Sequence, residues 1–189
     1  MRNPSHILTV VTRDQVGIIA SITGVLDKAG VQLLELSQTV VWEYFTIILV
    51  INVPKEVNAE KLNLEIRSNV GSGVAATLVP YQGGKPVNIH GERYILTATG
   101  IDRPGIVHTI TEIIARRRGN FTDLSTRITD KHFSMVAEID LPEEVFLDQL
   151  RIDLQNAGAK VGLQIRLQHN RLFVATNEIA FRRVIDDKR

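Results

Sequence analysis

The sequence contains no cysteine among its 189 residues, and its five histidines are scattered. The missing thiols exclude disulfide bonds and thiolate-bound zinc, and they fit a protein of a reducing compartment. No two histidines have the i, i+4 spacing that would place them on one helix face. We therefore expect neither a metal nor a cofactor.

Long hydrophobic runs and an excess of one charge are also absent. The chain carries 22 basic and 21 acidic side chains, so nothing pulls it as a whole toward nucleic acid or an anionic membrane. The longest mainly apolar run, residues 45–51, is far shorter than the roughly 20 residues of a membrane helix. The first six residues are polar and lack the apolar core of a signal peptide. We expect a cytoplasmic protein that does not contact a membrane.

The familiar catalytic motifs are missing as well. The sequence has no Gly-x-Ser-x-Gly elbow, no Walker loop and no His-Glu-x-x-His helix. The Gly-Ser-Gly at residues 71–73 is too short for a dinucleotide fingerprint, and it follows a predicted helix rather than a strand. The sequence therefore predicts a protein that is not an enzyme.

What the chain does contain is an internal repeat. Residues 9–23 match residues 97–111, with Asp14 opposite Asp102 and Gly17 opposite Gly105, so that both pairs lie 88 residues apart (102 − 14 and 105 − 17). Residues 35–37 match 123–125, and 45–54 match 133–142, at the same offset. Only the junctions near Gly30/Gly119 and near Gly71/Gly158 need a one-residue slip. Because a solenoid needs at least three copies, we predict two tandem domains.

Each copy shows the same alternation of periodicities. In the first copy, Ile18, Ile22 and Val25 share one face of a predicted helix. The expected strands are residues 6–12, 32–41, 45–53 and 74–81, and the expected helices are 17–29, ending in a left-handed Gly30, and 56–68. In the second copy the strands are 94–100, 121–128, 133–141 and 161–168, and the helices are 105–118 and 143–156. Glu143 and Glu144 suit the positive end of the last helix.

This order predicts an α+β fold of two tandem ferredoxin-like βαββαβ domains with antiparallel sheets, whose first and third strands are central. The domains are residues 5–82 and 93–170, joined by a linker at 83–92. Residues 171–189 form a C-terminal extension. Its apolar residues predict that its first part packs on a domain, and its last four residues are expected to fray (Leu172, Phe173, Ile179 and Phe181; residues 186–189).

The turn between the first strand and the first helix has the chemistry of a ligand site. The first N–H groups of a helix have no internal partner and attract anions such as a carboxylate. Pro104 suits the first helical position, and Gly105 permits close approach of a ligand. Asp102 would hold an ammonium group, so the turn would recognise both ends of an α-amino acid. The simpler alternative, in which the aspartate only caps the helix and the glycine only serves packing, stays open.

The stretch Asp102-Arg103-Pro104-Gly105-Ile106-Val107, followed by an amphipathic helix, a glycine, Asn120 and a strand, resembles an ACT domain. Two such units over residues 6–170 resemble the glycine cleavage system transcriptional repressor group of ACT proteins. The resemblance implies amino-acid binding at domain interfaces, near the first turn and the start of the second strand. By position, the second-copy site residues are Asp102, Arg103, Gly105, Ile106, Val107 and Asn120, and the first-copy residues are Asp14, Gln15, Gly17, Ile18 and Gln32.

The first copy departs from that pattern. Gln15-Val16 stands in place of Arg-Pro, and Val31-Gln32 stands where asparagine is usual. The second site is therefore favoured.

The preferred function is a regulatory protein that binds a small amino acid, with glycine and serine as candidates, and modulates a protein partner in transcriptional or metabolic regulation. One alternative is an adaptor or oligomerisation protein without a ligand. Another is an RNA-binding module, suggested by the basic run at residues 116–118. The helix dipole explains that run, and the aromatic pattern of RNA-binding sheets around Phe45 and Phe133 is missing.

Residues 45–51 also predict an assembly. Both alternating sets of this strand, Ile47/Leu49/Ile51 and Ile48/Val50, are apolar. One set is expected to face the helices, which leaves the other on the open face of the sheet. Apolar side chains on an open sheet face are unfavourable when exposed to solvent, so a second domain or a second chain is expected to cover them. A homodimer is predicted.

Overall fold

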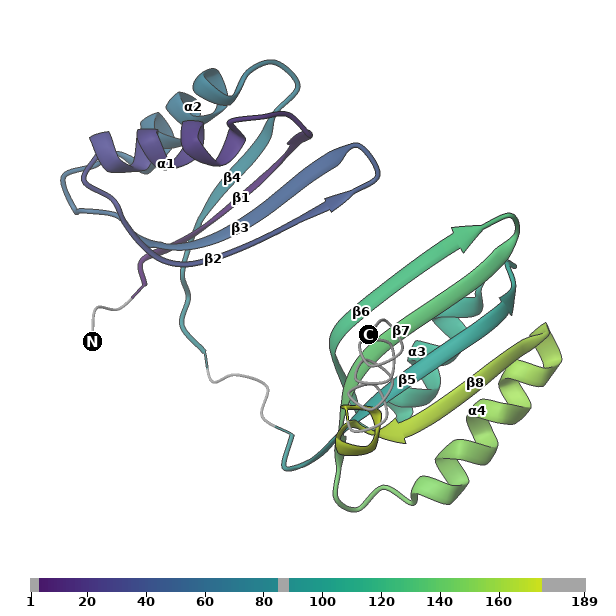
Figure 1. Ribbon diagram of the computed structural model, residues 1–189. Coiled ribbons are helices and arrows are strands. Elements are labelled where there is room, and N and C mark those ends of the chain that lie inside the picture. The colour runs from purple at the N-terminus through teal and green to yellow at the C-terminus, as the bar shows by residue number, and fades with distance from the viewer. Residues whose placement is uncertain (1–3, 85–88, 175–189) are drawn as a thin grey trace, which may run out of the picture. The chain divides into compact units, whose positions relative to one another are not determined.

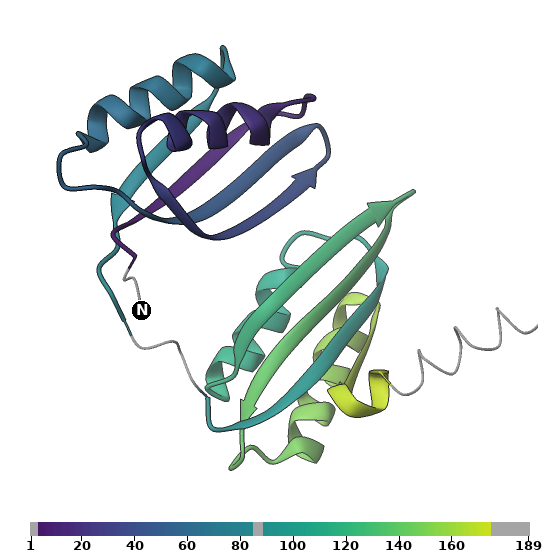
Figure 2. The same cartoon turned by 60° about the vertical axis from the view of Figure 1, so that its left-hand side comes forward.

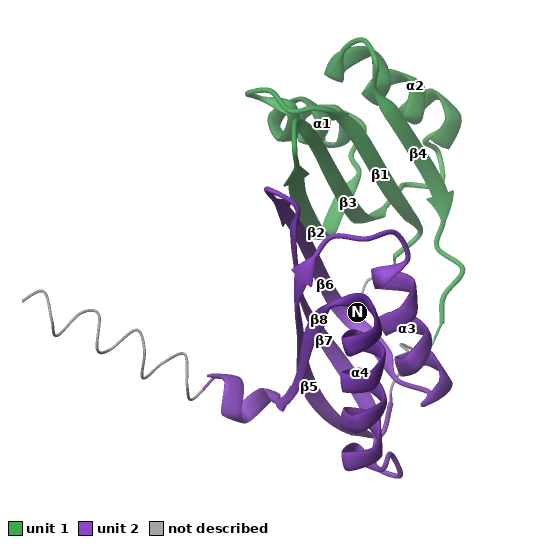
Figure 3. Ribbon diagram, turned by 90° about the vertical axis from the view of Figure 1, so that its right-hand side faces the viewer, with its two compact units in different colours: residues 1–84 green, residues 85–189 purple. Residues whose placement is uncertain are grey.

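A computed structural model describes residues 4–84 and 89–174 of the chain. The chain divides into two compact units, Met1–Gly84 and Lys85–Arg189 (Figure 3). In each unit two helices cover one face of a four-stranded antiparallel sheet (Figures 1 and 2). The predicted pair of α+β βαββαβ folds is thus confirmed. The expectations for Ile179, Phe181 and residues 186–189 lie outside the described residues.

Both sheets place their first and third strands at the centre, as predicted. The first unit has strand order β2-β3-β1-β4 and the second has β6-β7-β5-β8. The elements of the first unit are β1 (His6–Arg13), α1 (Ile18–Lys28), β2 (Gln32–Val41), β3 (Tyr44–Asn52), α2 (Ala59–Val70) and β4 (Ala75–Pro80). Those of the second are β5 (Gly91–Ile101), α3 (Ile106–Arg116), β6 (Asn120–Thr129), β7 (His132–Pro142), α4 (Leu147–Val161) and β8 (Leu163–His169). Residues 170–174 add a helical turn.

Each core lies between one sheet face and its two helices. In β3 the side chains of Ile47, Leu49 and Ile51 are fully buried against the helices, whereas Ile48 on the other face is 48% exposed. One apolar set therefore faces the helices and the other lies on the open face, as expected, and the structure shows that Ile47, Leu49 and Ile51 form the helix-facing set. In β7, Met135 takes the buried role of Ile47. The proposal that a second domain or chain covers the other face stays a prediction.

The two central hairpins have the same design. A two-residue turn joins each pair of strands, so that Val41 pairs with Tyr44 and Thr129 pairs with His132. Each edge strand also carries a β-bulge two residues after its start, between Leu33 and Glu35 in β2 and between Phe121 and Asp123 in β6. A short turn and a bulge together fix the register of a hairpin.

The repeat runs without a slip at the first junction, where the sequence comparison is wrong. Gly30 ends α1 with φ 66°, and the residue that does the same after α3 is Arg118 with φ 60°, not Gly119. Gly30 N–H donates to Asp27 and Arg118 N–H donates to Ala115, so the offset stays at 88 (118 − 30 and 115 − 27). A left-handed arginine is less favourable than a glycine but is tolerated at a helix end.

The second junction does shift by one residue, but in the opposite direction to the Gly71/Gly158 match, whose offset is 87 (158 − 71). Val11 pairs with Ala75 in β4, whereas Thr99, its match in the repeat, pairs with Gln164 in β8. The offset is therefore 89 (164 − 75).

The second helix of each unit starts later than predicted. Helix α2 begins after Asn58, whose side-chain oxygen accepts a hydrogen bond from Lys61 N–H at 2.9 Å. Before α4, Val145 N–H donates to the Pro142 carbonyl and closes a turn. Glu143 and Glu144 thus precede the helix, and Asp148 is the acidic residue of its first turn. No helix within residues 4–84 and 89–174 has the length and apolarity of a membrane span.

Candidate functional site

The turn before the first helix has the same backbone in both units. Gly17 (φ 94°) and Gly105 (φ 88°) are the N-cap residues, and both are left-handed. Thr109 N–H donates to the Gly105 carbonyl at 2.9 Å, as Ser21 N–H does to Gly17. In α3, the N–H groups of residues 106–108 lie between the N-cap and the first residue that donates a helical hydrogen bond. They therefore have no partner inside the helix. Unpartnered amides at a helix start can attract an anion.

Two details of the sequence interpretation change. Pro104 lies two residues before Ile106, the first helical residue, rather than at the first helical position. The capping role considered for Asp14 and Asp102 is wrong, because the cap residues are the glycines and no side chain accepts a cap hydrogen bond. Both aspartates are solvent-exposed, so their carboxylates are accessible to a cation.

The hairpin anchors each turn. Asp14 N–H donates to the Glu43 carbonyl at 2.8 Å, and Asp102 N–H donates to the Lys131 carbonyl at 2.8 Å. In the first unit, Arg13 and Glu43 also form an exposed ion pair at 3.0 Å. Because the turn is tied to the hairpin, a ligand at the helix start would also meet residues of the second and third strands.

A cavity of about 270 Å³ lies at this corner in the first unit. Four of the five predicted first-copy residues line it, together with five others (Asp14, Gln15, Gly17 and Ile18, with Ile19, Ala20, Gln38, Val40 and Phe45). Gln38 and Val40 pair with Ile47 and Phe45, so they lie on the helix-covered side of the sheet. Sequence reasoning missed this wall, although the predicted topology already placed the hairpin next to the first strand.

Gln15 has a structural partner in addition to its place at the cavity. Its side-chain amide donates to the carbonyl of Val70, the last residue of α2, at 3.2 Å. Ile18 and Ile106 are buried, so only their backbone amides are available to a ligand. Arg103, Gly105 and Val107 in the second unit are solvent-exposed. The residues that match the first-unit wall there are Thr126 and Ile128, which pair with Met135 and Phe133.

Gln32 and Asn120 lie at the other end of the sheet from the turns. Asn120 pairs with Asp140, and Asp140 pairs with Arg93 at the start of β5, whereas the turn follows Ile101 at its end. The eight-residue separation along β5 (101 − 93) corresponds to about 26 Å. Gln32 pairs with Asn52, likewise distant from Arg13 and the turn. Within one unit, a small ligand therefore cannot touch both predicted halves of the site.

The surroundings of Asn120 are electrostatically satisfied. Arg93 binds both oxygens of Asp140, with Nε–Oδ1 at 2.8 Å and Nη2–Oδ2 at 3.3 Å. The hydrogen bond to Asp140 and its negative charge raise the pKa of Arg93 above its ordinary value. This strand end thus offers an amide next to a paired charge rather than a free cation.

Two other site classes find little support. Phe45 and Phe133 are each 4% exposed and belong to the cores beneath the helices, so neither can stack on a base. Within the described ranges, no group of three histidine, aspartate or glutamate side chains could hold a metal ion.

The chain thus consists of two βαββαβ units with glycine-capped turns at equivalent positions. The family model of the ACT domain matches residues 6–70 and 92–168, and the chain belongs to the ACT domain family, in two tandem copies. The resemblance seen in the sequence is thereby confirmed.

Individual relatives match a stretch of this chain about as long as one unit. A UPF0237 protein of Methanopyrus kandleri is 35% identical over 88 residues, which cover 46% of this chain and 98% of that protein. A UPF0237 protein of Methanocaldococcus jannaschii is 33% identical over 82 residues, covering 43% and 91%. These relatives are thus about one unit long.

Solved structures match both units together. A protein of unknown function from Galdieria sulphuraria has a TM-score of 0.69 and 18% identity, covering 88% of this chain and 98% of that one. A candidate glycine cleavage system transcriptional repressor has a TM-score of 0.64 and 16% identity, covering 87% and 96%. At these identities the likeness concerns the fold.

Proposed function

We propose that this chain is a non-catalytic regulatory protein that binds a small amino acid at its strand-to-helix turns and modulates a protein partner. Membership of the ACT family supports a ligand-binding regulatory role. The observation that carries the proposal is the corner cavity in the first unit, where an exposed carboxylate faces the start of a helix capped only by a left-handed glycine.

The chemistry of this corner matches both ends of an α-amino acid. The carboxylate of the ligand accepts hydrogen bonds from the unpartnered amides of α1, which carry partial positive charge. Its ammonium group pairs with Asp14. The cavity of about 270 Å³ is smaller than the roughly 300–1,000 Å³ of pockets for larger ligands, and Ile19 and Val40 are part of its apolar lining. These limits favour a small side chain, with glycine and serine as the first candidates.

The second turn offers the same backbone with stronger charges. Arg103 replaces Gln15 and adds a guanidinium that can bind a carboxylate directly. His108 replaces Ala20 at the third residue of the helix. We propose that this turn binds the same class of ligand, and that charge rather than enclosure supplies its affinity.

The distant positions of Gln32 and Asn120 support a site completed by another copy of the chain. Because neither residue can reach the turn of its own unit, we propose a homodimer in which they approach a ligand held by the partner copy. Binding then changes the dimer only through its different affinities for two arrangements of the copies. A cytoplasmic protein that controls transcription or metabolism through such a change is the fuller form of the proposal.

Calorimetry against the twenty common amino acids tests this function. At least one small amino acid should bind, and Asp14→Asn and Asp102→Asn should each weaken one site about tenfold by removing the charge opposite the ammonium group. Asp27→Asn, at the far end of α1, is the control and should leave binding unchanged. Absence of heat for every amino acid at millimolar concentration would disprove the amino-acid proposal.

The protein partner is a separate part of the proposal. Trp42 stands 92% exposed at the tip of the first hairpin, next to the turn through the Asp14–Glu43 hydrogen bond. An exposed aromatic side chain at a hairpin tip is a suitable contact for another protein. If a ligand-free double variant, Asp14→Asn with Asp102→Asn, retained all partner binding, the adaptor function would be favoured instead.

A further inference from the structure

The two helix pairs are packed differently. Helices α1 and α2 contact each other more extensively than α3 and α4 do. Val25 on α1 is only 3% exposed, whereas Ile113, its match on α3 (113 − 25 = 88), is half-buried. At the C-cap of the same helix, Ala29 packs against the first core, and its match is Arg117, which forms an ion pair with Asp153 of α4. An ion pair between two polar side chains thus stands between α3 and α4 where the first unit has an alanine methyl group.

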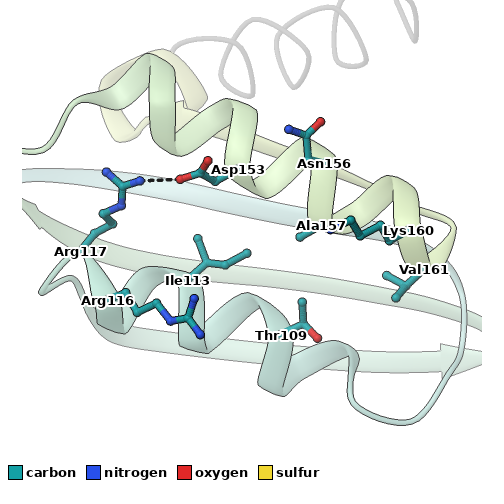
Figure 4. A pocket seen from close by; sticks show the side chains of 9 residues that line it. All are labelled: Thr109, Ile113, Arg116, Arg117, Asp153, Asn156, Ala157, Lys160 and Val161. Carbon is teal, nitrogen blue, oxygen red and sulfur yellow. Dashed lines mark hydrogen bonds and ion pairs between the residues drawn. The ribbon is translucent and has the colours of Figure 1, made fainter.

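The space between α3 and α4 is a groove of about 630 Å³. Its apolar lining comes from Ile113, Ala157 and Val161, and its polar lining includes three cations and one carboxylate (Arg116, Arg117, Lys160 and Asp153). Figure 4 shows the Arg117–Asp153 pair at one end and Lys160 with Val161 toward the other. The volume lies within the range of small-molecule pockets, roughly 300–1,000 Å³.

The charges at the two ends differ in whether they are already neutralised. Arg117 Nη2 lies 2.5 Å from Asp153 Oδ2, and Gln149 holds the other oxygen of that carboxylate at 2.9 Å. Arg116 pairs with Glu112 at 2.7 Å. Lys160, in contrast, makes no side-chain hydrogen bond or ion pair within residues 4–84 and 89–174. An anion entering the groove would find its free cation at Lys160.

We propose that this groove binds a small organic carboxylate with an apolar tail. The tail covers Ile113 and Ala157, and the carboxylate pairs with Lys160 near Val161. The proposal goes beyond the amino-acid site, because it uses none of the residues assigned there. Each site can therefore fail its test without affecting the other.

An NMR titration of the full chain, with sodium octanoate as the probe and 1-octanol as the uncharged comparison, tests the proposal. Octanoate should give saturable shifts at Ile113, Ala157 and Lys160. Lys160→Gln should weaken octanoate about tenfold, the loss expected for one charge-assisted contact, and leave octanol unchanged. Lys28→Gln, which removes a cation from the last turn of α1, is the matched control and should change nothing.

A second variant tests the apolar half of the groove. Ala157→Leu should fill the space over Ile113 and weaken both probes, with amide shifts elsewhere confirming that the fold is intact. The proposal would be overturned by octanoate and octanol binding equally well, by unchanged affinity in Lys160→Gln, or by shifts spread evenly over both units.

Discussion

The two strand-to-helix turns share a backbone but use their side chains differently. Gly17 and Gly105 have nearly the same φ, and an equivalent backbone hydrogen bond connects each turn to the hairpin of its unit. In the first unit, however, Gln15 donates a hydrogen bond to the end of α2, whereas the equally exposed Arg103 makes no side-chain hydrogen bond or ion pair in the described part of the chain. A repeat therefore preserves the geometry of a potential site more strictly than the groups that would select a ligand.

The largest expected effect tests whether the two units are energetically independent. Ile22→Ala and Ile110→Ala remove matched buried side chains, and each should cost about 2–5 kcal/mol of unfolding free energy through lost burial and a cavity. Amide hydrogen exchange should show the loss only in the unit that carries the change. Equal loss of protection in both units would mean that they unfold together.

The next effect tests the shared backbone. Gly17→Ala and Gly105→Ala force a left-handed alanine and should each cost about 1–2 kcal/mol. A Cβ at either position would meet nothing within 4 Å, so the cost is conformational and should be equal in the two units. Gly24→Ala, inside α1 and equally unobstructed, is the control and should stabilise the first unit by roughly 0.5–1 kcal/mol in denaturant unfolding.

A smaller effect tests the side-chain difference. Gln15→Arg removes the hydrogen bond to Val70 and should destabilise the first unit by about 1 kcal/mol. The reverse exchange, Arg103→Gln, alters an exposed residue and should stay within about 0.5 kcal/mol of the original in the same unfolding assay. Equal costs for the two exchanges would show that Gln15 is not a structural tie.

The smallest effect is a pH dependence confined to the second unit. Burial, together with the hydrogen bond to Glu92 and its negative charge, raises the pKa of Tyr94, whose match in the first unit is His6 (94 − 88). A raised pKa favours the neutral phenol in the folded state. The contribution of the Tyr94 phenol to the free energy of unfolding is complete below the ordinary tyrosine pKa of about 10. It is lost as the pH rises through the pKa of Tyr94 in the folded protein.

Tyr94→Phe should therefore remove part of the stability loss above pH 10. The measurement is the difference in unfolding free energy between the two proteins from neutral pH upward. A difference that stays constant with pH would contradict the shift.

Sequence patterns were sufficient for the order of elements because apolar periodicity and the repeat agree. They failed at the starts of the second helices. Glu143 and Glu144 look like the first turn of a helix, but they lie in a hydrogen-bonded turn from Pro142 to Val145 that precedes the helix. At the site, the helix start was predictable from Gly105, whereas the wall formed by Gln38 and Val40 depends on strand pairing across the sheet. The distance of Asn120 from the turn likewise follows from register, which a local motif does not contain.

The bulges of β2 and β6 have a consequence for how these edges meet other molecules. Each bulge adds one residue, Leu34 or Thr122, and bends the outer hydrogen-bonding row near its beginning. A strand of another molecule that paired with this edge would lose its hydrogen-bond register at the bulge. We therefore expect intermolecular pairing only along the part of the edge strand beyond the bulge. The same bulge in both units therefore shortens the stretch of each of these edges to which a foreign strand could pair.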